Sequence, residues 1–249
     1  MAGVAAQALK SNRAKNCHLF PCHSTEMEEP PRADVIVSET LGNYALEENI
    51  VDTLNDAHRR HLKPGGIVIP SRLRQIAAPV ITKRIHEELS VWDGVGHGLD
   101  MPAAKAMSLN NVYVRTLAMG ELLDEGRSAK VWDEIDLSRE NRSTRKGELT
   151  WTAKRSIKIY GFAVWWAAEL VPGIELGTGP QDPRTHWEQL YFPLLSPINL
   201  DPAHSLKLTL RSRSSEEAGT HLAWTAVLQD AQGKALERQA LDLDKGWIR

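Results

Sequence analysis

The chain has 249 residues, of which 42% are hydrophobic and 25% are charged, and its net charge is -2 at pH 7. This is the composition of an ordinary globular protein with one large domain or two small ones. The near-neutral charge gives no basic footprint for a nucleic-acid partner, and no apolar run is long enough to span a membrane.

The first seventy residues have the pattern of an α/β unit. Residues 4–15 are predicted as a short helix with one apolar face, and residues 17–21 as a strand. Residues 34–38, with the apolar run Val35-Ile-Val37 at their centre, have the pattern of a parallel strand covered on both faces. Residues 48–62 are predicted as a helix that ends at a Lys-Pro-Gly-Gly turn, and residues 67–70 as the next strand. This order indicates the second half of a doubly wound sheet.

Of the two cysteines of the chain, Cys17 begins the first predicted strand and Cys22 follows directly after it. They are separated by an odd number of residues, so on an extended strand their side chains face opposite sides. The adjacent histidines, His18 and His23, give a spacing that matches no zinc finger or ribbon. We therefore expect no metal site and no local disulfide. With no secretory signal evident at the start, a reducing cytoplasm is the expected location.

The character of the sequence changes after residue 70, so we predict two domains, residues 1–70 and residues 71–249. Residues 84–104 contain three glycines between helix-like ends, which predicts an excursion from the main body. Short alternating apolar runs separated by polar turns then predict an all-β sandwich or barrel. The predicted strands cover residues 74–82, 112–117, 131–137, 149–159, 162–170, 189–195, 206–211, 222–228 and 235–241.

Two glutamates, Glu39 and Glu48, bracket the loop that follows the apolar run of residues 34–38. Open α/β sheets bind their ligands at the carboxyl ends of the strands. Two carboxylates aimed into one cleft suit a planar cation such as guanidinium, whose N–H donors match a carboxylate bidentately. The alternative for Glu48 is a first-turn acid that is favoured only by the dipole of the following helix.

Three blocks of this sequence together resemble the protein arginine methyltransferase family. Ser38-Glu39-Thr-Leu-Gly42 through Glu48-Asn-Ile50 is similar to the family's double-glutamate loop, although the common form has Glu-Trp-Met-Gly. Leu62-Lys-Pro-Gly-Gly-Ile-Val-Ile-Pro70 resembles the helix end and strand that follow that loop, and Thr185-His186-Trp187 resembles the family's Thr-His-Trp loop. Val91-Trp-Asp-Gly-Val-Gly96 is similar to the dimerisation arm.

The resemblance implies an α/β plus all-β fold, namely the C-terminal half of a Rossmann-like methyltransferase sheet followed by a β-barrel domain. A helical dimerisation arm is expected near residues 84–104. The implied activity is methyl transfer from S-adenosyl-L-methionine to the arginine of a protein or peptide substrate, carried out by a homodimer. By the same resemblance, Glu39 and Glu48 would clamp the substrate guanidinium, and His186 would belong to a relay that removes its proton.

The resemblance also assigns Trp187 and Thr185 to substrate binding and Ser24 and Thr25 to contact with the adenine of the cofactor. The family's glycine-rich cofactor loop and acidic ribose-binding residue have no counterpart in this sequence. We therefore expect an N-terminally truncated member whose own activity is in doubt. Two alternatives stay open: a non-catalytic dimerising or interaction module, and a methyltransferase that acts on another cationic or amide acceptor.

Overall fold

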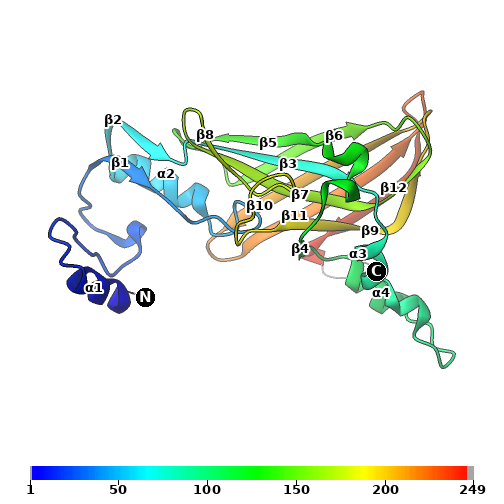
Figure 1. Cartoon of the computed structure of the whole chain (residues 1–249), viewed down its shortest axis with the longest axis horizontal. Coiled ribbons are helices and arrows are strands. Elements are labelled where there is room, and N and C mark those ends of the chain that lie inside the picture. The colour runs from blue at the N-terminus through cyan, green and yellow to red at the C-terminus, as the bar shows by residue number, and fades with distance from the viewer. Residues whose placement is uncertain (1, 246–249) are drawn as a thin grey trace.

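The computed structural model describes residues 2–245, so the predicted domain of residues 71–249 extends a little beyond them. The molecule is elongated (Figure 1). A small α/β segment lies at one end, two large sheets form the rest of the body, and a helical arm projects from its side.

The N-terminal segment makes few contacts with the body. Helix α1 (Ala2–Ser11) has no buried residue, and the 3-10 turn η1 (Ser24–Glu26) follows a stretch that is exposed throughout. The predicted strand at residues 17–21 is wrong, because these residues have no neighbouring strand with which to form a ladder. Cys17 and Cys22 are both exposed and form no disulfide.

One βαβ unit supports the α/β prediction. Strands β1 (Ala33–Val37) and β2 (Leu62–Ile69) pair in parallel, and helix α2 (Ile50–Arg60) connects them. The expectation that β1 is covered on both faces is wrong, because Val35 is 46% exposed and Val37 is 71% exposed. Within residues 2–245, β2 is the only strand that pairs with β1.

Helix α2 begins later than the predicted helix at residues 48–62. Asn49 has φ 57° and ψ 30°, a left-handed conformation that interrupts the helical path immediately before Ile50. Glu48 therefore precedes the N-cap residue instead of lying in the first turn. This position argues against a role for Glu48 that depends only on the helix dipole.

The β-rich prediction is confirmed, in the form of two antiparallel sheets. One sheet has the strand order β4-β9-β7-β3-β5, with β8 paired to β7, and the other has the order β12-β11-β10-β6. The strands are β3 (Arg72–Val80), β4 (Tyr113–Arg115), β5 (Lys130–Asp136), β6 (Thr144–Trp151), β7 (Ile157–Val171), β8 (Ile174–Gly177), β9 (Gln189–Leu200), β10 (Ser205–Ser215), β11 (Gly219–Gln229) and β12 (Ala235–Asp242). Both sheets are open: no ladder joins them in the described part of the chain, so the predicted barrel is not closed.

The predicted strand at residues 149–159 is wrong in its boundaries. It covers the end of β6, a turn, and the beginning of β7. Trp151 and Ile159 are both buried core residues on either side of this turn. In the sequence they therefore read as parts of one alternating strand. Strand β7 then continues for 15 residues and carries the central tryptophans Trp165 and Trp166.

The main hydrophobic core extends across the predicted boundary at residue 70. Buried side chains of the acidic loop and of α2, including Leu46 and Leu54, belong to the same cluster as Trp166 and Trp224 of the sheets. The apolar stripe of α2 is therefore covered by the β-rich part of the molecule, as an amphipathic helix requires.

The predicted excursion is a helical arm that extends slightly beyond residues 84–104. It comprises α3 (Arg84–Leu89), the 3-10 turn η2 (Val91–Gly94) and α4 (Pro102–Leu109). In Figure 1 it points away from both sheets. Every helix within residues 2–245 is too short or too polar to cross a bilayer.

Candidate functional site

The acidic loop, residues 38–49, has a buried middle and exposed acidic ends. It starts where Ser38 N donates to the carbonyl of Ile69, at the carboxyl ends of β1 and β2. Glu39 and Glu48 are both exposed. The loop thus presents its two predicted clamp residues to solvent while its apolar side chains anchor it to the core.

Close packing inside the loop explains its glycine. A Cβ on Gly42 would lie 2.0 Å from Oε2 of Glu47, so only glycine fits there without rearrangement. That same oxygen accepts a hydrogen bond from Tyr44 N at 3.3 Å. Trp166 of β7 donates from Nε1 to the carbonyl of Gly42 at 3.0 Å. The turn of the loop is therefore attached directly to the large sheet.

The Thr-His-Trp segment attaches to the same loop. Trp187 Nε1 donates to the carbonyl of Leu41 at 2.7 Å, and Glu188 N donates to Oδ1 of Asn43 at 2.8 Å. The Trp187 ring also meets that of Trp166 edge-on, with centroids 5.1 Å apart. Two motifs separated by about 145 residues are thus joined by hydrogen bonds, as expected if they serve one site.

Thr185 and His186 have different roles in this segment. The hydroxyl of Thr185 lies 3.2 Å from both the amide nitrogen and the carbonyl oxygen of Trp187, which fixes the turn. The exposed ring of His186 packs on Trp187 with centroids 4.0 Å apart. Within residues 2–245, no hydrogen bond or ion pair orients the imidazole. The proton relay predicted for His186 thus stays a prediction.

A buried polar network connects the acidic loop to the strands of the two sheets. Tyr44 donates its hydroxyl to Ser212 at 2.7 Å and accepts from Gln75 at 3.3 Å. Gln75 also donates to Asp133, which pairs with Arg145. Burial raises the pKa of Tyr44, so its hydroxyl stays protonated and able to donate. Sequence reasoning missed these residues because they come from the loop and four different strands, and no spacing relates them.

The predicted adenine-contact segment is held by α2. The guanidinium of Arg60 donates to the carbonyls of Ser24 and Thr25, both at 3.0 Å. It also pairs with Asp56, and this hydrogen bond lowers the pKa of the Asp56 carboxyl. No hydrogen bond in the described part of the chain connects Ser24 or Thr25 to the acidic loop or to the Thr-His-Trp segment.

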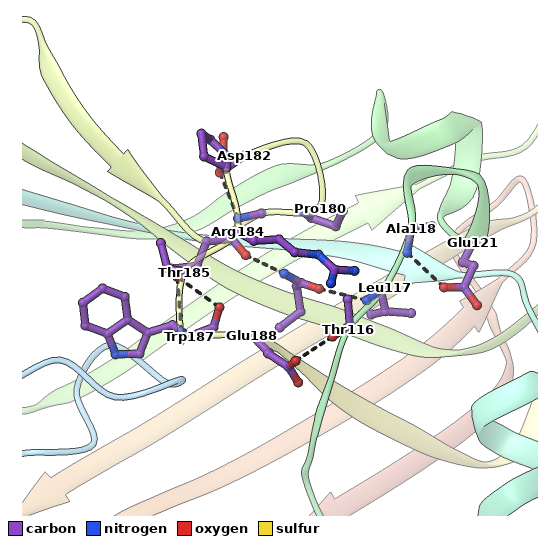
Figure 2. A pocket seen from close by; sticks show the side chains of 14 residues that line it. Thr116, Leu117, Ala118, Glu121, Pro180, Asp182, Arg184, Thr185, Trp187 and Glu188 are labelled. Atoms are coloured by element: carbon purple, nitrogen blue, oxygen red, sulfur yellow. Dashed lines mark hydrogen bonds between the residues drawn. The ribbon is translucent and has the colours of Figure 1, made fainter.

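A cavity of about 370 Å³ lies on the other side of the Thr-His-Trp segment (Figure 2). Its walls come from residues 116–121, which follow the arm, and from residues 178–189, which lead into β9. Thr185 and Trp187 line it. The segment therefore has the acidic loop on one side and this cavity on the other.

Comparison with known proteins supports the sequence resemblance. A family model described as the arginine methyltransferase oligomerization subdomain matches residues 75–226. The chain is 27% identical over 233 residues to protein arginine N-methyltransferase 6 of Xenopus tropicalis, which covers 82% of this chain and 68% of that protein. It is 29% identical over 173 residues to protein arginine N-methyltransferase 1 of Saccharomyces cerevisiae, and this match covers 66% of this chain and 49% of that protein. The chain thus spans about half to two thirds of the length of these relatives.

Solved structures support the fold. The Trypanosoma brucei PRMT1 enzyme-prozyme heterotetrameric complex with AdoHcy contains a chain that matches with a TM-score of 0.82 and 19% identity, over 97% of this chain and 78% of that one. Arabidopsis thaliana protein arginine methyltransferase 10 matches with a TM-score of 0.76 and 20% identity, over 97% of this chain and 80% of that one. Nearly the whole chain therefore has the fold found in these structures.

Proposed function

The chain belongs to the protein arginine methyltransferase family, and we propose that it forms the acceptor-binding part of an enzyme that methylates arginine side chains of proteins. One observation above all supports the proposal. The Thr-His-Trp segment is hydrogen-bonded to the loop that carries Glu39 and Glu48, through Trp187 Nε1 and the carbonyl of Leu41.

In this proposal Glu39 and Glu48 clamp the substrate guanidinium between them. A guanidinium is a poor nucleophile because its lone pairs are delocalised. Two carboxylates can hold positive charge away from the attacking nitrogen and fix its direction, which combines electrostatic stabilisation with positioning. Trp187 lines the arginine pocket, and His186 belongs to the group of residues that receives the proton.

The methyl donor in this proposal is S-adenosyl-L-methionine, which supplies a methyl group on a positively charged sulfur. The similarity to a complex described with AdoHcy supports this choice. The hydroxyls of Ser24 and Thr25 fit the polar edge of an adenine, because a hydroxyl both donates and accepts hydrogen bonds. Arg60 holds the turn that carries them. Within residues 2–245 we assign no side chain to the ribose or to the methionine part.

We further propose a homodimer that forms through the arm. Four large apolar side chains of the arm are exposed, with Val91 59%, Val95 37%, Leu99 61% and Met107 55% accessible. Exposed apolar groups of this kind are typical of interaction surfaces. The match to an oligomerization subdomain supports this assignment, and it also favours a second candidate function, a non-catalytic module that assembles with an active chain.

Mass spectrometry of a matched peptide pair tests the proposal. The chain is incubated with S-adenosyl-L-methionine and with peptides that differ only in carrying arginine or lysine. We expect any methylation to fall on the arginine peptide alone, to be lost in Glu39→Gln and Glu48→Gln, and to be retained in Glu125→Gln, which changes an exposed residue outside the acidic loop and the Thr-His-Trp segment.

Each other outcome has a definite meaning. Methylation confined to lysine would reject the arginine assignment. Normal methylation by both clamp variants would reject the clamp. A chain that dimerises but methylates neither peptide would favour the non-catalytic module.

A further inference from the structure

The cavity beside the Thr-His-Trp segment has walls that are already fixed by hydrogen bonds. Gln189 donates to the carbonyl of Thr178 at 2.6 Å and accepts from Leu117 N at 2.9 Å, so its amide joins the two wall segments. Thr116 donates its hydroxyl to Glu188 at 2.6 Å, which joins them a second time. A preformed cavity of this kind binds a ligand at a lower entropic cost than mobile loops would.

Three carboxylates line the cavity, and each already accepts a hydrogen bond from its walls. Asp182 accepts from Gly179 N at 2.9 Å, and Glu188 accepts from Thr116. Glu121 accepts from Ala118 N at 2.9 Å and pairs with Arg84 at 2.9 Å. The negative charges of the lining are therefore held in place by the protein itself.

The one cation of the lining, Arg184, differs from these acids. Figure 2 shows its side chain reaching across the cavity toward residues 116–118. Arg184 is exposed, and no residue from 2 to 245 forms a hydrogen bond or an ion pair with its guanidinium. A guanidinium presents five N–H donors in a rigid fork that matches a carboxylate or a phosphate. An anionic acceptor on a ligand would therefore satisfy the guanidinium of Arg184, which the acids of the lining leave unpaired within residues 2–245.

The cavity adjoins the proposed arginine site. Trp187 lines the cavity and also donates to the carbonyl of Leu41 in the acidic loop. Glu188 likewise connects the cavity wall, through Thr116, to Asn43 of the loop. The cavity and the acidic loop are therefore neighbours, connected through Trp187 and Glu188.

We propose that the cavity is a specificity subsite for the protein substrate, in which Arg184 pairs with an acidic side chain close to the target arginine. The inference rests on the proposed function and names a substrate class for it. The shared chemistry is an anion on the peptide, which is either the carboxylate of aspartate or glutamate or the phosphate of a phosphoserine. Arg184 would then select among arginine-containing sequences.

Peptide binding measured by fluorescence anisotropy tests the inference without methyl transfer. Labelled arginine peptides carry asparagine, aspartate, phosphoserine or lysine at one flanking position, which is scanned on both sides of the arginine. We expect the aspartate or phosphoserine peptide to bind about threefold to tenfold more tightly than the asparagine peptide at one position. The two acidic peptides distinguish a carboxylate ligand from a phosphate ligand.

Variants assign this preference to Arg184. Arg184→Gln should remove it, and Arg184→Lys should retain part of it, because the charge remains while the fork is lost. The matched control Arg211→Gln, which removes an exposed arginine from β10, should leave it unchanged. Glu39→Gln should weaken every arginine peptide by the same factor and keep the acidic preference.

The outcomes separate this inference from the proposed function. Equal binding of all four peptides, tighter binding of the lysine peptide, or an acidic preference that survives Arg184→Gln would overturn the subsite. If no arginine peptide binds the wild-type chain, both the proposed function and the subsite are wrong.

Discussion

Residues 41–57 and residues 2–37 are neighbours in the sequence, yet they differ greatly in how much of their side chains is buried against the body of the molecule. The acidic loop and α2 bury Leu46 and Ile50 completely and lie in the same core as the sheets. Helix α1 buries nothing, and Val37 of β1 is 71% exposed. The loop that carries Glu39 and Glu48 therefore depends on the β-rich part for its position much more than on the strand that precedes it.

The largest expected effect comes from the tryptophan that joins the loop to the sheet. Trp166 is 1% exposed and donates to the carbonyl of Gly42. Trp166→Ala should lower the free energy of unfolding by about 3–5 kcal/mol, because it leaves a large cavity and an unpaired carbonyl. Chemical denaturation followed by circular dichroism measures this change.

The control for that experiment lies in the other region. Val4 of α1 is 70% exposed, so Val4→Ala should change stability by less than about 0.5 kcal/mol. Equal effects of Trp166→Ala and Val4→Ala would contradict the difference between the two regions.

A smaller effect is expected from the network beneath the loop. Tyr44→Phe removes the hydroxyl that bonds Ser212 and Gln75, and it should cost about 1–2 kcal/mol of stability because two buried polar partners lose a bond. Affinity for an arginine peptide should fall as well, because the loop loses part of its support. If the affinity of Tyr44→Phe stayed normal while its stability fell, the network would support the fold without positioning the clamp.

The smallest effect concerns the junction between the arm and the sheets. Burial lowers the pKa of His86 below its ordinary value of 6.5, and His86 Nε2 lies 3.1 Å from the carbonyl oxygen of Leu194. The unfolded chain therefore binds the proton more readily. The stability contributed by neutral His86 is fully present above about pH 6.5 and is lost as the pH falls through the folded-state pKa.

Thermal unfolding across this pH range measures the effect of His86. The wild-type stability should fall on acidification, and His86→Gln should flatten the dependence. An unchanged pH dependence in His86→Gln would show that other groups cause it.

The sequence predicted much of this arrangement from local signals. Three features were predicted because each depends on the hydrophobic pattern within a single helix or strand. They are the apolar run before Glu39, the amphipathic pattern of α2 and the alternating strands after residue 112. The acidic loop was predicted from its two glutamates after an apolar strand, whereas the Thr-His-Trp segment came from a resemblance, which also indicated that the two belong to one site.

What the sequence did not predict depends on contacts between distant elements. The left-handed conformation of Asn49 makes α2 begin at Ile50. Asparagine adopts both helical and left-handed conformations, so the sequence did not reveal which one it has here. The network from Tyr44 to Asp133 joins segments that no periodicity relates. The predicted strand at residues 17–21 failed because a strand needs a partner, and the composition of a segment does not reveal whether one exists.

The clamp is tested most directly by isothermal titration with two isosteric peptides, one that contains arginine and one that contains neutral citrulline at the same position. We expect the wild-type chain to prefer arginine, Glu39→Gln and Glu48→Gln each to reduce this preference by about tenfold or more, and the exposed control Glu125→Gln to leave it intact. Equal affinity of the wild-type chain for both peptides would contradict the account, and so would an unchanged arginine preference in the two clamp variants.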